Sequence, residues 1–181
     1  TLGAELKRLP TQPGIQLELQ RMISTDGKRV VTLNKKNSAV LWDTDKATPL
    51  ALFETTKFAC SVCAFSSDGK QLFFGDSGGK LHVLNASTGK STAEHDTNVG
   101  GVNSIHLSPN EQAVATVGVD KSVHIFSLKE KKILHSFKGH SDWGLQAAFL
   151  NDKLLLSTQI NGRPKVWNTE TAKPVELEPG H

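Results

Sequence analysis

Cysteine and long apolar runs are scarce in this sequence, and each scarcity excludes a class of protein. Only two cysteines occur in 181 residues, too few for the disulfide framework of a small secreted domain. No stretch approaches the roughly 18 consecutive apolar residues of a membrane-spanning helix. The chain also opens without the charged and apolar regions of a signal peptide. We therefore expect an intracellular protein, cytoplasmic or nuclear, with no membrane partner.

An excess of one charge is also missing. The chain has 21 lysines and arginines against 18 aspartates and glutamates, a formal net charge of +3. Nucleic-acid-binding domains usually concentrate basic residues in one run or on one face, and no such run occurs here. With 37% hydrophobic and 22% charged residues, the composition fits a globular protein and excludes a disordered polyampholyte.

What the sequence does contain is a repeat with a period of 41 or 42 residues. Four hydrophobic groups end strand-like runs, and their anchors are Trp42, Leu84, Phe126 and Trp167. A turn-like segment recurs with the same period, at Ser24–Lys28, Ser66–Lys70, Ser108–Glu111 and, more loosely, Asn151–Lys153. A third marker is the pair Gly139-His140 and Gly180-His181. Periods of this length indicate a repeat architecture.

Within one period the sequence reads as short strands separated by turn residues. In the third repeat, the predicted strands are 102–107, 113–117, 122–127 and 133–137. Ser108-Pro109-Asn110 has typical turn chemistry, and the first two repeats have Asp-Gly at this place, a signal for a tight hairpin. No helical periodicity of useful length occurs. The pattern therefore predicts an all-β fold.

Four antiparallel strands in each repeat resemble the blade of a WD-repeat (WD40-type) β-propeller. The resemblance covers essentially the whole chain, although the Trp-Asp dipeptide is intact only at Trp42-Asp43. It implies four blades of four-stranded antiparallel sheet, at about 14–56, 57–98, 99–140 and 141–181. Residues 1–13, around Glu5 to Leu9, would add one outer strand of a preceding blade. Family propellers usually have seven or eight blades, so further blades of a longer chain, or a second copy, would complete the ring.

In this family a blade is often locked by four hydrogen-bonded side chains: a histidine, a serine or threonine, an aspartate and a tryptophan. The resemblance implies such a lock in the fourth repeat, from His140, Ser157 and Trp167, with Asn161 where aspartate is usual. Other repeats keep parts of the set, namely Thr116 and Asp120 in the third and Thr32 and Trp42 in the first. The second repeat has lost it.

The family commonly recognises peptides or proteins on the face that holds the loops before the first strand and between the second and third strands. Carried over to this chain, the face comprises Lys35–Lys36, Lys57–Phe58, Asp76–Ser77, His95–Asn98, Asp120–Lys121, Ser141–Trp143 and Asn161–Arg163. Trp143 is the leading candidate for partner contact, because tryptophan and arginine are enriched in binding hot spots. Asp142 is a further candidate for partner contact, and Lys36, Lys121 and Arg163 would form a mixed basic rim for an acidic peptide. Two alternatives stay open: Trp143 packed between blades, and the basic residues as ordinary solvated surface.

Two motifs suggest chemistry but are better explained by structure. Ser87–Thr92 ends like a phosphate-binding loop, but it lacks the earlier glycine and is followed by a predicted strand instead of a helix. Cys60 and Cys63 have the spacing of metal and redox motifs. On a regular strand, residues three apart point to opposite faces, which favours core packing of these thiols.

The histidines are the remaining candidates for metal binding or catalysis. His82 and His124 lie 42 residues apart, which makes a paired site conceivable, but no third ligand is predictable. No Ser-His-Asp arrangement follows from any local spacing. We therefore expect no cofactor, no metal and no catalysis.

These observations favour a non-catalytic protein-interaction scaffold that binds a protein or peptide on its loop face. The alternative is nucleic-acid binding through the basic loops, which a steep loss of affinity with salt would reveal. A propeller enzyme with a central metal comes third. Propellers host many unrelated functions, so the resemblance does not identify a partner.

Overall fold

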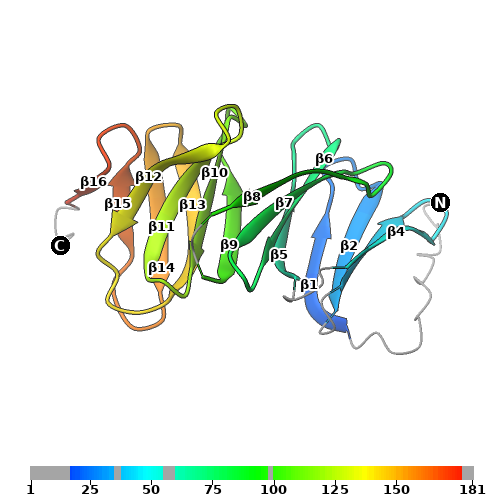
Figure 1. Ribbon diagram of the computed structural model, residues 1–181, viewed down its shortest axis with the longest axis horizontal. Coiled ribbons are helices and arrows are strands. Elements are labelled where there is room, and N and C mark those ends of the chain that lie inside the picture. The colour runs from blue at the N-terminus through cyan, green and yellow to red at the C-terminus, as the bar shows by residue number, and fades with distance from the viewer. Residues whose placement is uncertain (1–16, 35–37, 55–59, 98–99, 177–181) are drawn as a thin grey trace, which may run out of the picture.

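The computed structural model describes residues 17–34, 38–54, 60–97 and 100–176. Its strands form four antiparallel sheets of four strands each, in chain order (Figure 1). Blade 1 consists of β1 (Leu17–Ile23), β2 (Arg29–Asn34), β3 (Ser38–Asp43) and β4 (Thr48–Glu54). Blade 2 consists of β5 (Cys60–Phe65), β6 (Gln71–Asp76), β7 (Lys80–Asn85) and β8 (Ser91–Asp96). Blade 3 consists of β9 (Val102–Leu107), β10 (Ala113–Gly118), β11 (Ser122–Ser127) and β12 (Lys132–Lys138). Blade 4 consists of β13 (Gly144–Asn151), β14 (Leu154–Gln159), β15 (Lys165–Asn168) and β16 (Lys173–Val175).

The all-β prediction is confirmed, and the four strands predicted for the third repeat are found with ends that differ by at most one residue. The extra outer strand predicted within residues 1–13 lies outside the described residues. Within the described ranges, we find no helix with the length and apolarity that a membrane crossing would require.

The recurring turn marker has a physical role, because its serine closes the hairpin between the first two strands of a blade. Ser24 Oγ donates to Asp26 Oδ1 at 2.6 Å, and Ser66 Oγ donates to Asp68 Oδ1 at 2.7 Å. In blade 3, Ser108 Oγ likewise donates to Asn110 Oδ1 at 2.7 Å. Short polar side chains of this kind stabilise turns by bonding to nearby groups.

The hydrophobic core lies between the blades. Three clusters of buried side chains join blade 1 to blade 2, blade 2 to blade 3, and blade 3 to blade 4. Because side chains alternate along a strand, neighbouring residues serve different clusters. Phe74 faces blade 1 and Phe73 faces blade 3, and both are almost fully buried. This two-sided burial explains why the central strands read as continuous apolar runs.

The first strand of a blade contains a bulge, and this feature contradicts the expectation that residues three apart point to opposite faces. In β9 the pairing slips between Val102 and Ser104. Val102 and Ile105 consequently belong to one buried cluster. A comparable slip follows Cys60 in β5. Cys63 is fully buried in the core as expected, whereas the side chain of Cys60 lies outside the described ones.

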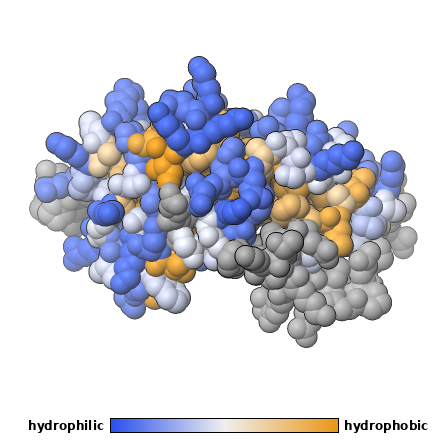
Figure 2. Space-filling model, viewed as in Figure 1, coloured by the Kyte–Doolittle hydropathy of each residue, from blue (hydrophilic) through white to orange (hydrophobic). Residues whose placement is uncertain are grey.

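The four blades stand side by side in an open row, with blade 1 and blade 4 at its two ends (Figure 1). The first strands of successive blades, β1, β5, β9 and β13, contact one another in turn. Both end blades expose apolar side chains, among them Ile23, Leu52 and Leu150. Figure 2 shows apolar surface at the right of the view, toward blade 1, and smaller apolar areas at the left, among hydrophilic surface.

Candidate functional site

The structure brings three of the four predicted lock residues of blade 4 together. Trp167 Nε1 donates to Ser157 Oγ at 2.7 Å, and the same hydroxyl lies 2.7 Å from His140 Nε2. All three side chains are buried. Burial, followed by the positive charge of Lys165, lowers the pKa of His140. The neutral imidazole can therefore accept the serine proton at Nε2, and the hydroxyl links histidine to tryptophan.

Asn161 does not join this lock, contrary to the prediction. Its side chain is exposed, and Nδ2 donates to Asp142 Oδ2 at 2.9 Å. A carboxylate is a stronger acceptor than the neutral groups of the lock, so the asparagine turns toward the loop before β13. Position Asn161 therefore belongs to the loop face and not to the interior of the blade.

The partial locks of blades 1 and 3 differ in whether the threonine hydroxyl accepts a hydrogen bond from a tryptophan indole. In blade 1, Trp42 Nε1 donates to Thr32 Oγ1 at 2.9 Å. In blade 3, the anchor is Phe126, which has no N–H, and the buried hydroxyl of Thr116 has no partner within the described structure. The predicted contribution of Thr116 to a lock is thus contradicted by the missing indole donor.

Asp120 takes part in a different arrangement, which local spacing did not reveal. Its Oδ2 lies 2.9 Å from His124 Nε2, and His124 Nδ1 lies 2.8 Å from Ser136 Oγ. The structure thus contains a Ser-His-Asp grouping that could not be predicted from local spacing. The sheet brings the three together because His124 and Ser136 are cross-strand partners on β11 and β12.

Blade 2 shows what this arrangement does. His82 Nε2 lies 2.9 Å from Asp76 Oδ2, and its Nδ1 lies 3.4 Å from Glu94 Oε2. Glu94 is the cross-strand partner of His82, so it occupies the place of the blade 3 serine. A carboxylate is no source of a hydroxyl nucleophile. The feature that both blades share is a clamp between a turn, the third strand and the fourth strand.

The two histidines also fail to form a joint metal site. Each is bonded to the aspartate of its own blade, and the ring of His82 packs edge-on against Phe53. In the ranges that the structure describes, no three histidine, cysteine or carboxylate side chains are grouped as a metal ion requires.

The phosphate-loop-like segment is the turn between β7 and β8, as predicted. Asn85 Oδ1 accepts from the backbone N–H groups of Ser87 and Thr88 at 2.9 and 3.1 Å, and strand β8 follows. The turn thus closes on its own asparagine and does not lead into a helix that could hold phosphate.

Trp143 lies on the surface, which contradicts the alternative that it packs between blades. Half of its accessible area is exposed, and Ile160, 48% exposed, lies across from it. The two are joined by a backbone hydrogen bond from Ile160 N to Trp143 O of 3.0 Å. We call the group of Trp143, Ile160, Asp142 and Asn161 the Trp143 platform.

The loop that carries Trp143 is held by several hydrogen bonds. Gln159 Oε1 accepts from Ser141 N at 2.8 Å and from Asp142 N at 3.1 Å. Asp142 Oδ1 accepts from Trp143 N at 2.8 Å. This bond, then the Asn161 amide, keeps the pKa of Asp142 below its usual range. The loop is therefore fixed by bonds at each of its residues.

Lys121 ties the platform to blade 3. Its Nζ donates to Ser141 O at 3.0 Å, across the boundary between the blades. Lys121 has a φ of +64°, in the left-handed region, whereas blade 2 has Gly79 at this place in the repeat. This conformation is strained for a residue other than glycine, and such strain persists only where the surrounding structure enforces it. Arg163 is exposed in the turn after Asn161.

Blade 3 has the same backbone pair without the platform. Val119 N donates to Gly101 O at 3.3 Å, as Ile160 N does to Trp143 O. Blade 4 therefore places two large side chains where blade 3 has a glycine and a valine. The predicted face residues of blade 1 and the start of blade 2, Lys35, Lys36, Lys57 and Phe58, lie outside the described residues, as does Asn98.

Comparison with known proteins agrees with this architecture. The family model of the WD domain, G-beta repeat, matches residues 89–127. Autophagy-related protein 18 of Meyerozyma guilliermondii is 33% identical over 57% of this chain and 19% of its own length. Autophagy-related protein 16 of Arabidopsis thaliana is 24% identical over 83% of this chain and 30% of its own length. The chain thus spans less than a third of these relatives.

Two solved structures share the fold. The structure of U3-55K superposes with a TM-score of 0.81 at 17% identity, over 92% of this chain and 53% of that one. The RRP9 WD40 repeats superpose with a TM-score of 0.80 at 18% identity, over 92% and 52%. At such identities the likeness shows the fold alone. Together with the matched family model and the relatives, it supports a WD-repeat family for this chain.

Proposed function

We propose that this chain is a non-catalytic interaction scaffold that binds a protein or peptide partner at the Trp143 platform. The WD-repeat fold supports a protein-interaction scaffold in general. The observation that carries the finer proposal is a half-exposed tryptophan on a loop fixed by hydrogen bonds. An intracellular setting is part of the proposal and rests on the sparse cysteines.

The platform has the properties of a binding hot spot. Tryptophan contributes a large contact area with only two side-chain torsions, so little conformational entropy is lost when it is covered. Because the loop is already ordered, binding does not have to order it. Ile160 extends the apolar surface, and the polar groups of Asp142 and Asn161 satisfy one another at its edge.

The rim of the platform indicates which partner it favours. Lys121, which bonds to Ser141 O, and Arg163, two residues after Asn161, are both exposed. The platform itself contains one carboxylate, that of Asp142. We therefore propose a partner segment with an apolar anchor for Trp143 and Ile160 and acidic residues beside it. Complementary charge of this kind mainly raises the association rate and the specificity.

The test compares Trp143→Ala with Leu134→Ala in the full-length protein. Leu134 is a control because it is an exposed apolar residue of blade 3, at the end of the blades away from the platform. Proteins captured from cell extract are identified by mass spectrometry, and their affinities for each variant are measured with purified components. We expect Trp143→Ala to weaken binding by more than about 2 kcal/mol and Leu134→Ala to leave it nearly unchanged.

Two outcomes would overturn the proposal. Equal binding by the Trp143→Ala variant would show that partners dock elsewhere on the chain. Capture of RNA or DNA, with affinity that falls steeply between low and moderate salt, would favour the nucleic-acid alternative through the basic loops.

A further inference from the structure

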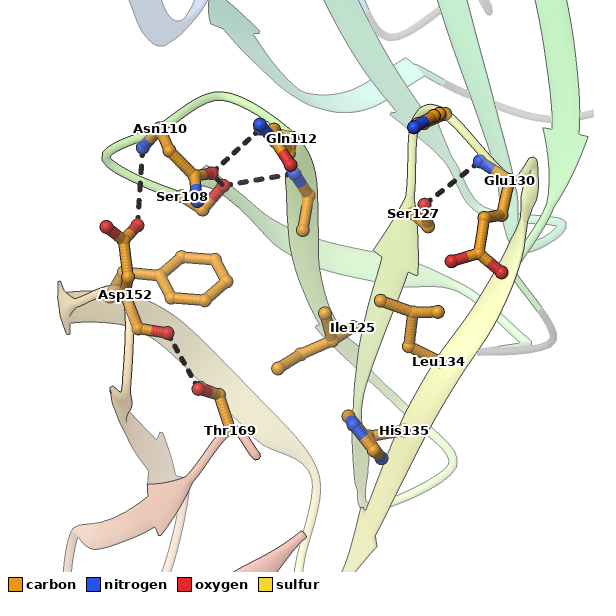
Figure 3. Close-up of a pocket in the computed structure, with 13 residues that line it drawn as sticks. Ser108, Asn110, Gln112, Ile125, Ser127, Glu130, Leu134, His135, Asp152 and Thr169 are labelled. Carbon is orange, nitrogen blue, oxygen red and sulfur yellow. Dashed lines mark hydrogen bonds between the residues drawn. The ribbon is translucent and has the colours of Figure 1, made fainter. Parts of the chain in front are cut away.

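A groove opens between blades 3 and 4, at the end of β13 away from the Trp143 platform. It has a volume of about 340 Å³. Buried Ile125 and Phe149 contribute to its lining, and Leu134, 39% exposed, stands beside them. Figure 3 shows Ile125 and Leu134 at the centre, with Asp152 and Thr169 on one side and Glu130 on the other. The eight residues of β13 separate the groove from the platform by roughly 26 Å.

One repeat position determines whether this groove is filled. After the third strand of each blade, a residue donates its backbone N–H to the first hairpin of the same blade: Thr44, Ala86, Leu128 and Thr169. In blade 3, Leu128 packs against the core cluster that blades 2 and 3 share. In blade 4 its counterpart is Thr169, a smaller and polar side chain that lines the groove.

The neighbouring position shows the same change. Ile133, the cross-strand partner of Phe126, also packs against the cluster between blades 2 and 3. Its counterpart in blade 4 is Pro174, the partner of Trp167, which is exposed. A smaller cavity, of about 200 Å³, likewise adjoins Ala86 between blades 1 and 2. A cavity therefore opens between two blades where the repeat position of Leu128 holds a smaller side chain, Ala86 or Thr169.

The charges at the groove favour a basic ligand. Asp152 is exposed, and its carboxylate accepts one hydrogen bond, from Asn110 N at 3.3 Å. In the described part of the chain, no lysine or arginine pairs with it. Glu130 pairs with Lys132 at 2.7 Å and lies on the side of the groove away from Asp152 (Figure 3). Lys129, which also lines the groove, directly precedes Glu130 in the sequence. An unpaired carboxylate beside an apolar floor is complementary to an aliphatic residue next to a basic one.

We propose that this groove is a second binding site, independent of the Trp143 platform, for a peptide segment. The segment places an aliphatic side chain over Ile125 and Phe149, where Leu128 fills the equivalent space in the neighbouring interface. An adjacent lysine or arginine of the segment pairs with Asp152. Main-chain groups of the segment can bond to the polar side chains at the rim, such as Thr169 and Asn110.

The probes are three blocked tetrapeptides added to the full-length protein: Ala-Leu-Arg-Ala, Ala-Leu-Glu-Ala and Ala-Ala-Arg-Ala. Binding is followed by NMR through the methyl signals of Ile125 and Leu134, which line the groove. We expect the first peptide to shift both signals in a saturable way, and the other two to bind at least several-fold more weakly. Equal binding of the glutamate peptide would overturn the proposed chemistry.

Three substitutions test the site itself. Thr169→Leu puts the blade 3 side chain into the groove and should weaken the Ala-Leu-Arg-Ala peptide about tenfold or more. Thr169→Val removes the bond from Thr169 Oγ1 to Asp152 O, 2.7 Å, without filling the groove, so binding should persist. Thr44→Leu is the matched control, because Thr44 Oγ1 makes the equivalent bond to Gly27 O at 2.7 Å in blade 1.

Asp152→Asn tests the charge and keeps an acceptor for Asn110 N. It should weaken the arginine peptide by about two- to fivefold, the usual range for an exposed ion pair, and reduce its advantage over the glutamate peptide. Unchanged peptide binding by Thr169→Leu would overturn the groove as the site. Trp143→Ala should leave these peptide affinities unchanged, so failure of one site is distinguishable from failure of the other.

Discussion

Individual hydroxyls in this protein have opposite roles at equivalent places. Thr32 in blade 1 accepts from the indole of Trp42, whereas Thr116 in blade 3 is buried without a partner in the described structure. A buried polar group that is bonded contributes to stability, and one that is not bonded reduces it. The identity of the anchor residue, tryptophan or phenylalanine, thus decides the role of the threonine.

Replacing each threonine by valine should show this difference. Thr32→Val leaves the Trp42 N–H without an acceptor, so we expect it to lower the free energy of unfolding by about 1–3 kcal/mol. Thr116→Val removes an unsatisfied hydroxyl and keeps the shape, so it should be neutral or slightly stabilising. Denaturant titration of both variants measures the difference. A similar loss in both would mean that Thr116 has an essential partner.

His140 gives the lock of blade 4 a dependence on pH. Burial, and then Lys165, lower its pKa in the folded protein, so the unfolded state takes up the proton first as the pH falls. The stability that depends on neutral His140 is complete above the ordinary value of about 6.5 and is lost below it, by at most about 1.4 kcal/mol per pH unit. His95, whose pKa burial and then Lys131 also lower, acts in the same direction.

This dependence can be measured as a difference between two proteins. We expect the stability cost of His140→Ala to be largest near pH 7.5 and to shrink toward pH 5, because the wild type alone loses the contribution of the neutral imidazole. Urea titrations of both proteins across this range provide the test. A cost that stays constant or grows in acid would contradict a lowered pKa.

At the scale of strands and blades, stability depends on how closely neighbouring sheets approach. Gly144, at the start of β13, packs so tightly against blade 3 that an added Cβ would overlap Val117 Cγ2. The inner strands are also joined by polar bonds, for example from Asn103 Nδ2 to Gly144 O at 2.8 Å. The contact between blades 3 and 4 therefore leaves no room for a side chain at this point.

Gly144→Ala should accordingly destabilise the protein by about 1–3 kcal/mol, the usual cost of overpacking. Combining it with Val117→Ala should cost less than the sum of the two changes, because the shorter side chain removes the clash. A double-mutant cycle by thermal or chemical unfolding measures this coupling. Simple additivity would indicate that the two residues are not in contact.

At the scale of the whole molecule, the described residues form an open row of blades in which the first and last blades each have a neighbouring blade on one side only. Ile23 and Leu52 of blade 1 are 63% and 59% exposed, and Leu150 of blade 4 is 55% exposed. A blade of a propeller normally covers both faces against neighbours. The relatives and structural neighbours extend well beyond the region matched here, which supports the proposal of a larger propeller.

We therefore predict that the isolated 181-residue chain associates at micromolar concentration or unfolds without a single cooperative transition. Sedimentation, together with calorimetry, provides the test. The addition of further blades from the parent chain should restore a monodisperse species. A compact monomer that unfolds cooperatively would contradict the prediction.

Much of the architecture could be predicted from the sequence, because it depends on local and periodic signals. Strand lengths follow from apolar runs between turn residues, and the 42-residue period marks each hairpin serine and each anchor, such as Trp42 and Trp167. These features need only neighbouring residues along the chain. They predicted the strands of blade 3 and marked both anchors, which are buried in the structure.

Contacts between distant residues depended on the tertiary structure. A bulge in β9 overrode strict alternation and put Val102 and Ile105 in one cluster, and cross-strand pairing assembled Asp120, His124 and Ser136. Only the packed blades show that Asn161 bonds to Asp142 instead of joining the lock. They also show that a groove lies beside Thr169 between blades 3 and 4, whereas Leu128 packs into the interface between blades 2 and 3. Sequence spacing determines which residues recur, whereas the approach of one blade to the next decides which of them meet.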